Sequence, residues 1–393
     1  MQSFQRSDVE GKSVIIRTDY NVPVVDGLIT DTERIDASLE TLKACLEFGV
    51  KRIVLISHFG KPQGFDPLLT LAPIRDYLAS KLDKDISLLP FLSPHELKGK
   101  LESSEQQIFM MENIRFYDGE TKNDPALGQE LSELGDTYIF EAFPSCHNSH
   151  ASILGIPSHL PSFLGMHCAY ELEHLSPLRS TSDALVIVGG KKLESKLTAI
   201  KNLCEHQRTV YIGGALFMPL YCHIHELDHM GTYTYNPGLR ESVEEILELC
   251  MSNQTTLVLP TDVAVENHDS IIRTCDVSEV KDDESVLDIG AFSRIQLLSL
   301  IDRFDTIIWN GPMGKFEDEA FSYGTADLIN KLSDTTKQVY VGGGDTISLL
   351  EKYHIAKDSF TFVSTGGGAF LDYISGVKMP VIDKLVNPST QLA

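Results

Sequence analysis

Five apolar, β-branched runs in the second half of the chain each end in glycine. They are Ala184–Gly190, Thr209–Gly214, Thr306–Gly314, Val339–Asp345 and Phe360–Gly368. Glycine lets a backbone approach an anion closely, and open α/β sheets bind ligands at the carboxyl ends of their strands. Where a helix begins at such a glycine, its free N–H groups and dipole favour a phosphate. The pattern predicts parallel strands that gather around a nucleotide.

The first half lacks this pattern, because only 11 of the 28 glycines precede residue 181. It carries polar and cationic side chains after its strand-like runs instead: Arg17, Asp19, Asn21, Arg34, His58, Lys61 and Arg115. Together they suit a small anionic substrate, although each alone also fits an ordinary loop position. His147 and His150 have no cysteine or carboxylate at metal-ligand spacing, which argues against zinc.

The segment from Gly342 to Thr346 is the sharpest single signal, since it follows an apolar strand and opens a helix-like stretch. Asp345 suits Mg²⁺, which takes one or two carboxylates together with phosphate oxygens. Thr346 would cap the helix or contact phosphate. A plain strand–helix turn with Asp345 as N-cap explains the segment equally well, so both alternatives stay open here.

A second cationic segment begins at Gly189. Lys192 and Lys196 are four residues apart, which predicts that they share one face at the start of a helix. Two cations there oppose the helix dipole, a cost in stability that makes sense if they grip a phosphoryl group. The alternative is a solvated basic turn. For Trp309–Glu317, which holds the only tryptophan, a plain loop is the simpler explanation.

Strand-like and helical runs alternate along the chain. Ser13–Thr18 and Arg52–Ser57 have strand composition, and Arg34–Gly49 has apolar residues at helical spacing ending at a glycine. Such alternation predicts parallel, doubly wound sheets. We therefore predict an α/β fold of two doubly wound, Rossmann-like domains that face a cleft and are joined by a hinge helix.

We place the domain boundaries where the βα pattern stops and restarts. The first domain covers residues 1–164, and residues 165–183 form the hinge helix and linker. The second domain covers residues 184–375. We expect the tail, residues 376–393, to return to the first domain.

Composition narrows the class of protein. A length of 393 residues favours two or three domains, and a net charge of −23 opposes nucleic-acid binding. Seven cysteines without CxxC spacing argue against a disulfide framework and for a reducing cytoplasm. No apolar run approaches the roughly 18 residues of a membrane helix, and the first residues lack the apolar core of a signal peptide. We expect a cytoplasmic protein with neither nucleic-acid nor membrane partners.

The common nucleotide-binding fingerprints are absent. The sequence contains no GxxxxGK[ST], no GxGxxG and no protein-kinase signature set. What it does contain, in order, are the segments RTDYNVPV, LISHFGKP, MMENIRFYDGETKND, VIVGGKKLESK, TIIWNGPMGKFE and VYVGGGDT. These segments resemble those of the phosphoglycerate kinase family, and the resemblance runs through almost the whole chain.

The resemblance implies two sets of site residues. The first domain would bind 3-phosphoglycerate or 1,3-bisphosphoglycerate through Asp19, Tyr20, Asn21, Arg34, His58, Phe59, Gly60, Lys61, Arg115 and Asn148. The second would bind ATP or ADP through Lys196, Gly213, Gly214, Gly290, Asn310, Pro312, Glu317, Gly343, Gly344, Asp345 and Thr346.

The resemblance also implies a reaction, the reversible transfer of a phosphoryl group between 1,3-bisphosphoglycerate and ADP. Arg34 and Lys192 would stabilise the equatorial oxygens, Lys196 the nucleotide phosphate, and Asp345 would bind Mg²⁺. Because the substrates belong to different domains, domain closure is expected. Family members are usually monomers, and we expect a monomer here.

The sequence departs from the family pattern at the substrate side. Asn148 stands where the family has a substrate-binding arginine. The other departures are Lys61 for arginine, Glu141 for aspartate, Pro144 for glycine, Ala215 for glycine and Phe292 for lysine. Asparagine carries no charge, whereas arginine binds phosphate in a bidentate manner. We expect an active kinase with weakened affinity for 3-phosphoglycerate, with a non-catalytic nucleotide-binding paralogue or a kinase for another acyl phosphate as alternatives.

Overall fold

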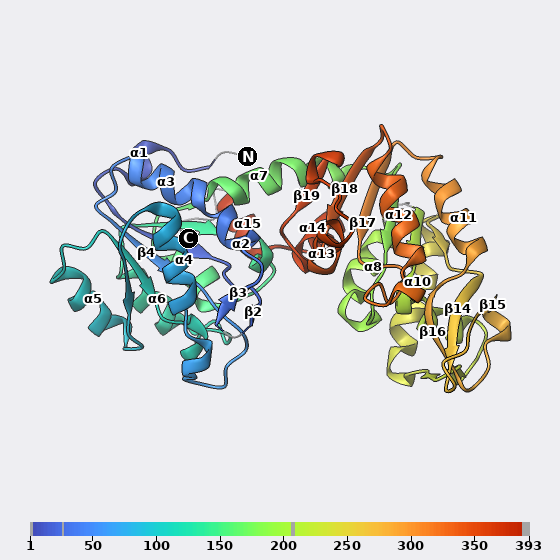
Figure 1. The fold of residues 1–393 in the computed structure, drawn as a ribbon. Coiled ribbons are helices and arrows are strands. Elements are labelled where there is room, and N and C mark those ends of the chain that lie inside the picture. The colour runs from blue at the N-terminus through green and yellow to red at the C-terminus, as the bar shows by residue number, and fades with distance from the viewer. Residues whose placement is uncertain (1–2, 26, 206–208, 387–393) are drawn as a thin grey trace. The chain divides into compact units, whose positions relative to one another are not determined.

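The structure, a computed structural model, describes residues 3–25, 27–205 and 209–386 (Figure 1). The chain divides into two compact units. The N-terminal unit comprises the described residues up to His174 together with those from Lys378 onward, and the C-terminal unit is Leu175–Val377. Residues 387–393 of the expected tail lie outside the described residues.

The N-terminal unit is built on a sheet of six parallel strands in the order β5-β6-β4-β1-β7-β8. The strands are β1 (Ser13–Thr18), β4 (Arg52–Ile56), β5 (Ile86–Leu89), β6 (Ile108–Met111), β7 (Thr137–Glu141) and β8 (Ser162–Leu164). Every residue of β1, β6 and β7 is buried. Burial of both faces is expected for a parallel sheet covered by helices on both sides, so the predicted doubly wound fold is confirmed for this unit.

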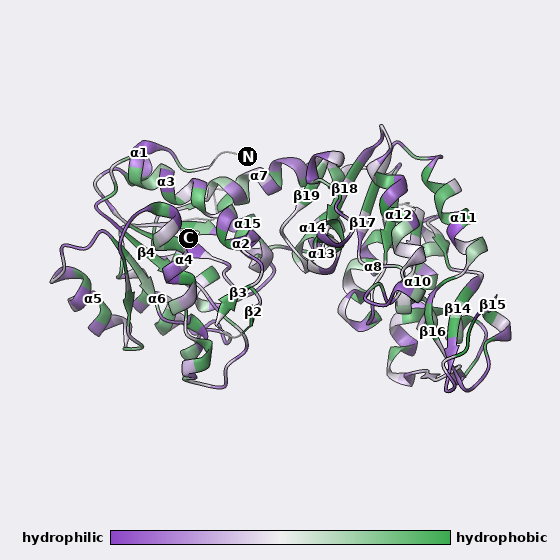
Figure 2. Ribbon diagram, in the orientation of Figure 1, coloured by the Kyte–Doolittle hydropathy of each residue, from purple (hydrophilic) through white to green (hydrophobic). Residues whose placement is uncertain are grey.

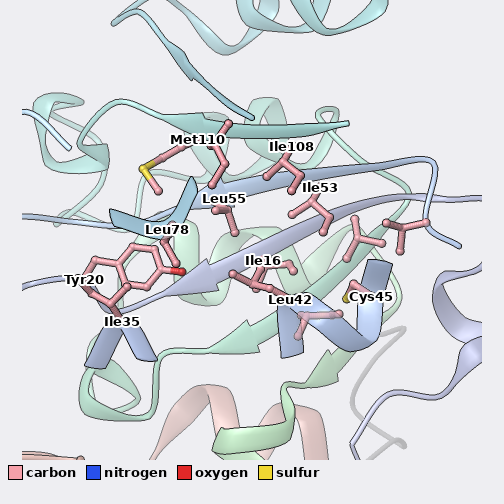
Figure 3. Close-up of a cluster of buried hydrophobic side chains, with 14 of the residues drawn as sticks. Ile16, Tyr20, Ile35, Leu42, Cys45, Ile53, Leu55, Leu78, Ile108 and Met110 are labelled. Atoms are coloured by element: carbon pink, nitrogen blue, oxygen red, sulfur yellow. The ribbon is translucent and has the colours of Figure 1, made fainter. Parts of the chain in front are cut away.

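The helices of this unit follow the predicted alternation. They are α1 (Arg6–Val9), α2 (Glu33–Ala37), α3 (Leu39–Glu47), α4 (Ala72–Leu82), α5 (Pro94–Glu102), α6 (Pro125–Ser132), α7 (Met166–Leu175) and α15 (Pro380–Val386). A short hairpin joins β2 (Val24–Val25) to β3 (Leu28–Ile29). Figure 3 shows how Leu42 and Cys45 of α3 pack over Ile16 and Ile53 of the sheet, which fixes α3 against the face of β1 and β4.

The single helix predicted over Arg34–Gly49 is wrong in one respect, because α2 ends at Ala37 and α3 begins at Leu39. The interruption is at Ser38. Its hydroxyl donates to the carbonyl of Ile35 at 2.8 Å and pairs with the hydroxyl of Tyr20 at 2.9 Å. Serine hydroxyls compete with helical hydrogen bonds in this way. Because of this break, Arg34 lies on the short helix α2 and not on α3.

The C-terminal unit contains the sheet that the glycine-ended runs predict. Its six parallel strands have the order β13-β10-β9-β17-β18-β19. They are β9 (Leu185–Val188), β10 (Thr209–Ile212), β13 (Thr256–Val258), β17 (Thr306–Asn310), β18 (Gln338–Gly342) and β19 (Phe362–Ser364). Numbered along the chain, this is the order 3-2-1-4-5-6 of dinucleotide-binding sheets, whose ligands bind where the order reverses. That point is between β9 and β17.

The rest of the C-terminal unit consists of helices and a smaller antiparallel sheet. The helices are α8 (Leu197–Cys204), α9 (Phe217–Ile224), α10 (Arg240–Ser252), α11 (Ala291–Ile301), α12 (Tyr323–Ser333), α13 (Gly344–Lys352) and α14 (Gly368–Ile374). The antiparallel sheet joins β14 (Asp262–Asn267) to β15 (Ile272–Asp276) and β16 (Glu284–Ile289), and a short hairpin joins β11 (His229–Met230) to β12 (Tyr233–Thr234). The patterns in the sequence did not predict this antiparallel sheet.

Hydropathy follows the layers of each unit. Figure 2 shows the strands of both parallel sheets as hydrophobic and the outer helices as mixed. In the C-terminal unit, α11, α12 and α13 cover the face that presents Ile187 and Trp309, both fully buried. Within the residues described, no helix combines the length and apolarity needed to span a bilayer.

Candidate functional site

Several predicted substrate residues of the N-terminal unit gather around Asp19, which lies at the carboxyl end of β1. We call Asp19, Asn21, Arg34, His58 and Arg115 the N-terminal cluster. Its Oδ1 accepts from Arg34 Nη1 at 3.4 Å and from the N–H of Asn21 at 3.2 Å, and its Oδ2 accepts from the hydroxyl of Ser145 at 2.6 Å. Burial raises the pKa of Asp19, but Arg34, the Ser145 hydroxyl and Arg17 outweigh it and hold the pKa below its usual value. The carboxylate therefore stays ionised and orients Arg34.

Asn21 links β1 to the loop after β4. Its side-chain Oδ1 accepts from the N–H of Gly60 at 2.9 Å, and its carbonyl accepts from Arg34 Nη1 at 3.2 Å. Gly60 has a φ of +61°, and a Cβ there would approach Leu69 Cδ2 to 2.9 Å. The loop thus needs glycine at this position. Tyr20 is buried, and its backbone N–H donates to Ser57 Oγ at 2.9 Å, so it anchors the loop from below.

Arg115 lies beside the same loop. Its Nη1 donates to the carbonyl of Gly60 at 2.5 Å, while its Nε is buried and has no hydrogen-bond partner among the described residues. Asn113, which the sequence analysis did not single out, holds Phe59 in place by accepting from the Phe59 N–H at 3.1 Å and donating to its carbonyl at 2.6 Å. Arg115 and Asn113 therefore both hold the loop Phe59–Gly60 in place.

Arg17, expected after a strand among the residues for an anionic substrate, instead lies inside β1 and belongs to a buried ion network. Arg17 is fully buried and donates to Ser152 Oγ at 2.8 Å, and Ser152 in turn donates to Glu120 Oε1 at 2.7 Å. Burial raises the pKa of Glu120, and Arg17 opposes that rise. A charged residue within the otherwise apolar strand Ser13–Thr18 is the sequence signal that indicates such a network.

The charge state of His58 follows from the same network. Arg17 Nη2 lies 3.3 Å from His58 Nδ1, and because a guanidinium only donates, Nδ1 must accept. Burial lowers the pKa of His58 to about 3, and Asp19 opposes this. The neutral ring carries its proton on Nε2, where it is a donor. Burial likewise lowers the pKa of His150 to about 4.

The residues that depart from the family pattern have distinct surroundings. Asn148 is half-buried, and its backbone N–H donates to the carbonyl of Ser145 at 3.0 Å, which places it next to the hydroxyl that Asp19 accepts from. Lys61 is exposed. Glu141 is buried at the end of β7 and accepts from the N–H groups of His167 and Cys168, both at 3.1 Å. Glu141 therefore caps α7.

In the C-terminal unit, Lys196 lies at the reversal point of the sheet. Its Nζ donates to the carbonyl of Gly189 at 2.7 Å, to the carbonyl of Asn310 at 3.3 Å, and to Asn310 Oδ1. Burial lowers the pKa of Lys196 to about 8, and Asp345 opposes this. The ammonium group is thus held by the ends of β9 and β17, where Rossmann-like sheets bind their ligands.

The prediction that Lys192 and Lys196 share a helical face is wrong. They flank a 3-10 turn, Leu193–Ser195, and α8 begins only after Lys196, whose φ of −125° and ψ of 1° are not helical. The hydrogen bonds of Lys196 to the two strand ends draw its side chain away from α8. Lys192 is exposed.

Close approach of the strand ends explains the glycines there. A Cβ on Gly213 would lie 2.5 Å from Met313 Sδ, and one on Gly214, whose φ is +61°, would lie 2.6 Å from the carbonyl oxygen of Gly190. Gly290 lies elsewhere, outside the pocket lining. A Cβ there would lie 2.2 Å from Asp262 Oδ2, so packing accounts for this glycine without a ligand.

The segment after β18 presents the start of α13. Gly343 has a φ of +115°, and a Cβ there would lie 2.8 Å from Asn310 Nδ2. Thr346 is buried, and its Oγ1 accepts from the N–H of Gly311 at 2.8 Å. Gly344 and Asp345 are exposed in the first turn. The backbone N–H groups of this turn have no helical partner.

A pocket of about 850 Å³ opens beside these elements. Four of the predicted nucleotide residues line it, namely Gly214, Pro312, Glu317 and Asp345. Asp288 also lines the pocket and accepts from the N–H of Gly324 at 2.8 Å. Burial raises the pKa of Asp288 to about 7. The volume suits a ligand of nucleotide size.

The residues present fit Mg²⁺ only as a partner of bound phosphates. Among the described residues, no group of three His, Cys, Asp or Glu side chains is placed to hold a metal ion. Asp345 offers a single exposed carboxylate at the pocket, and Mg²⁺ is usually bound by one or two carboxylates plus substrate phosphates.

Two doubly wound units, one with a cationic cluster and one with a glycine-lined pocket, define a two-domain α/β phosphotransferase. The family model for phosphoglycerate kinase matches residues 4–377, and the chain belongs to this family. The phosphoglycerate kinase of Maricaulis maris is 34% identical over 97% of this chain and 96% of its own length. That of Desulfovibrio desulfuricans is 35% identical over 97% of both chains.

Two solved structures of phosphoglycerate kinases are similar to this chain. The phosphoglycerate kinase of Coxiella burnetii is 29% identical with a TM-score of 0.79, and that of Pyrococcus horikoshii is 26% identical with a TM-score of 0.81. Each similarity covers 96% of this chain and 97% of the other. The chain is accordingly a kinase with a carboxyl group as acceptor, and the comparisons give no support to the non-catalytic alternative.

Proposed function

We propose that the N-terminal cluster binds 3-phosphoglycerate or 1,3-bisphosphoglycerate and that the C-terminal pocket binds ATP or ADP with Mg²⁺. The hydrogen bonds of Lys196 at the reversal point of the sheet carry this proposal. They put a cation where the glycine-ended strands converge. Arg34, oriented by Asp19 and Asn21, is the corresponding cation of the N-terminal cluster.

The chemistry is an in-line displacement at phosphorus. In the direction that makes ATP, a β-phosphate oxygen of ADP attacks the acyl phosphate, and the bond from phosphorus to the carboxyl oxygen breaks. The carboxylate of 3-phosphoglycerate leaves. Such transfers depend on positioning and charge stabilisation. Arg34 and Lys192 stabilise the equatorial oxygens, and Lys196 binds the nucleotide phosphate.

Other residues complete the two sites. His58 donates from Nε2 and Arg115 from its guanidinium to the substrate's anionic groups. Asp345 is the protein ligand of Mg²⁺, which neutralises phosphate charge when bound. We further propose a cytoplasmic monomer whose partners are these small molecules.

A coupled assay with ATP and 3-phosphoglycerate tests the proposal. Lys192→Ala should lower turnover by about 100-fold or more, as expected when a donor to the transition state is removed, and it should leave the fold intact because Lys192 is exposed. Lys331→Ala is the control, since Lys331 lies on α12 and pairs with Asp302 at the end of α11. Full turnover in Lys192→Ala would refute the assigned role.

A further inference from the structure

One wall of the pocket contains none of the residues that we predicted to bind the nucleotide. The paired strands β14 and β16 form it, and they contribute Glu266 and the run Ser285–Asp288 to the lining. Glu266 and Ser285 are opposite one another in the register of the two strands. The turn Gly214–Leu216, which follows β10 at the glycine side of the pocket, packs against β16.

The length of strand β16 shows how far this wall extends from the glycine-containing loops that follow the strands of the parallel sheet. At one end, a Cβ on Gly314 would approach Asp288 Oδ1 to 2.3 Å, and the N–H of Lys315 donates to the carbonyl of Leu287 at 2.7 Å. From Asp288 to Ser285 the strand advances by three residues, or ~10 Å at about 3.3 Å per residue. A nucleoside diphosphate whose phosphates lie at the glycine loops is long enough to bring its base to the far end.

Glu266 is a half-buried acceptor at that far end. No hydrogen bond or ion pair involves its side chain among the described residues, whereas the hydroxyl of its neighbour Ser285 pairs with that of Thr232 at 2.8 Å. An ionised carboxylate only accepts hydrogen bonds, and partial burial without a donor is unfavourable. Only water can donate to this carboxylate in the free pocket, and a ligand with a donor at this end would replace that water.

The position of Glu266 also fits a base better than a phosphate. A carboxylate next to phosphates repels them, whereas charges separated by about 10 Å are largely screened at physiological ionic strength. The lining includes the ring of Phe316 as well, an aromatic surface against which a base can pack.

We propose that Glu266 selects the nucleobase by accepting a hydrogen bond from the exocyclic 6-amino group of adenine. This inference depends on the proposed nucleotide site. Hypoxanthine carries a carbonyl oxygen at the same ring position, so with inosine nucleotides two acceptors would face each other. Glu266 therefore favours adenosine over inosine nucleotides.

Calorimetric titration of the full chain with ADP and with inosine diphosphate, both with Mg²⁺, tests this inference. The unsubstituted protein should bind ADP about tenfold more tightly or better, the range of one hydrogen bond to a charged group. In Glu266→Gln the amide can donate as well as accept, so the ratio of the two dissociation constants should approach one. Asp269→Asn removes the same charge from the exposed turn after β14 and should leave the ratio unchanged.

The outcomes separate this inference from the proposed function. Equal binding of the two diphosphates by the unsubstituted chain, or an unchanged ratio in Glu266→Gln, would overturn the role of Glu266 and leave the nucleotide site standing. Glu266→Ala, a second variant without an acceptor, should also lose the discrimination. If the unsubstituted chain binds neither diphosphate, the nucleotide site itself is refuted, and the role of Glu266 with it.

Discussion

The affinity for MgADP should fall as the pH rises through the pKa of Lys196. The ammonium is held among the carbonyls of Gly189 and Asn310, and burial lowers its pKa to about 8. A group with that pKa is about 90% protonated at pH 7 and about 10% protonated at pH 9. If only the charged form binds the phosphate, the dissociation constant should increase roughly tenfold between these pH values.

Titration calorimetry at both pH values measures this change, and Lys196→Arg provides the control because arginine stays charged throughout. The control is needed because Asp288 also lines the pocket, and burial raises its pKa to about 7. Its ionisation adds negative charge over part of the same range in both proteins. Equal affinity of the unsubstituted protein at pH 7 and pH 9 would refute the proposed contact between Lys196 and phosphate.

Three further predictions concern the substrate cluster and the glycine loop. Asn148→Arg should lower the KM for 3-phosphoglycerate about tenfold or more in steady-state assays, because it adds a charge-assisted hydrogen bond. Gly343→Ala should destabilise the protein by about 2 kcal/mol in urea unfolding, because its φ is +115° and its Cβ would crowd Asn310. The free energy of unfolding should decrease as the pH falls from 6.5 towards 4. His58 has a pKa of about 3 in the folded protein, so in this range it takes up its proton mainly in the unfolded chain. The free energy of unfolding then falls by at most about 1.4 kcal/mol per pH unit.

Each of these predictions has a contrasting outcome. An unchanged or higher KM in Asn148→Arg would mean that this position does not limit binding. Gly344→Ala should be nearly neutral, since nothing lies within 4 Å of its Cβ position, and equal losses in both glycine variants would contradict the strain argument. In His58→Gln the slope of stability against pH should flatten, and an unaltered slope would assign acid sensitivity to other groups.

The glycine-ended runs predicted five of the six strands of the C-terminal sheet, and these five are neighbours in it, whereas the edge strand β13 was not predicted. The sequence was sufficient for the cluster around Asp19, since carboxyl ends of parallel strands meet at one edge. Prediction from the sequence failed where the hydrogen bonds of a side chain override the local helical pattern. Ser38 interrupts a regular helical pattern through its hydroxyl, and Lys196 leaves α8 for two carbonyls that are distant in sequence.

Other elements depend on contacts that no local pattern encodes. Glu120 pairs with Ser152, 32 positions further along the chain, and a single carboxylate in a loop gives no hint of such a partner. Glu266 lines the pocket because β14 pairs with β16 in a particular register, and that pairing was not predicted. The resemblance implied that Gly290 binds the nucleotide, and the close approach of Asp262 gives a packing reason for a glycine there.

The order of the two units along the chain has a consequence for biosynthesis. The N-terminal unit is discontinuous, because its last segment follows the whole of Leu175–Val377. In that segment Met379 is buried, with its Sδ 3.5 Å from Cys146 Sγ, and Val381 is fully buried. A ribosome adds about 5–20 residues per second, so the unit made first must wait roughly 10 to 40 seconds for the helix that completes its core. All residues of the C-terminal unit are synthesised before this last segment, so the C-terminal unit can finish folding before the N-terminal unit does.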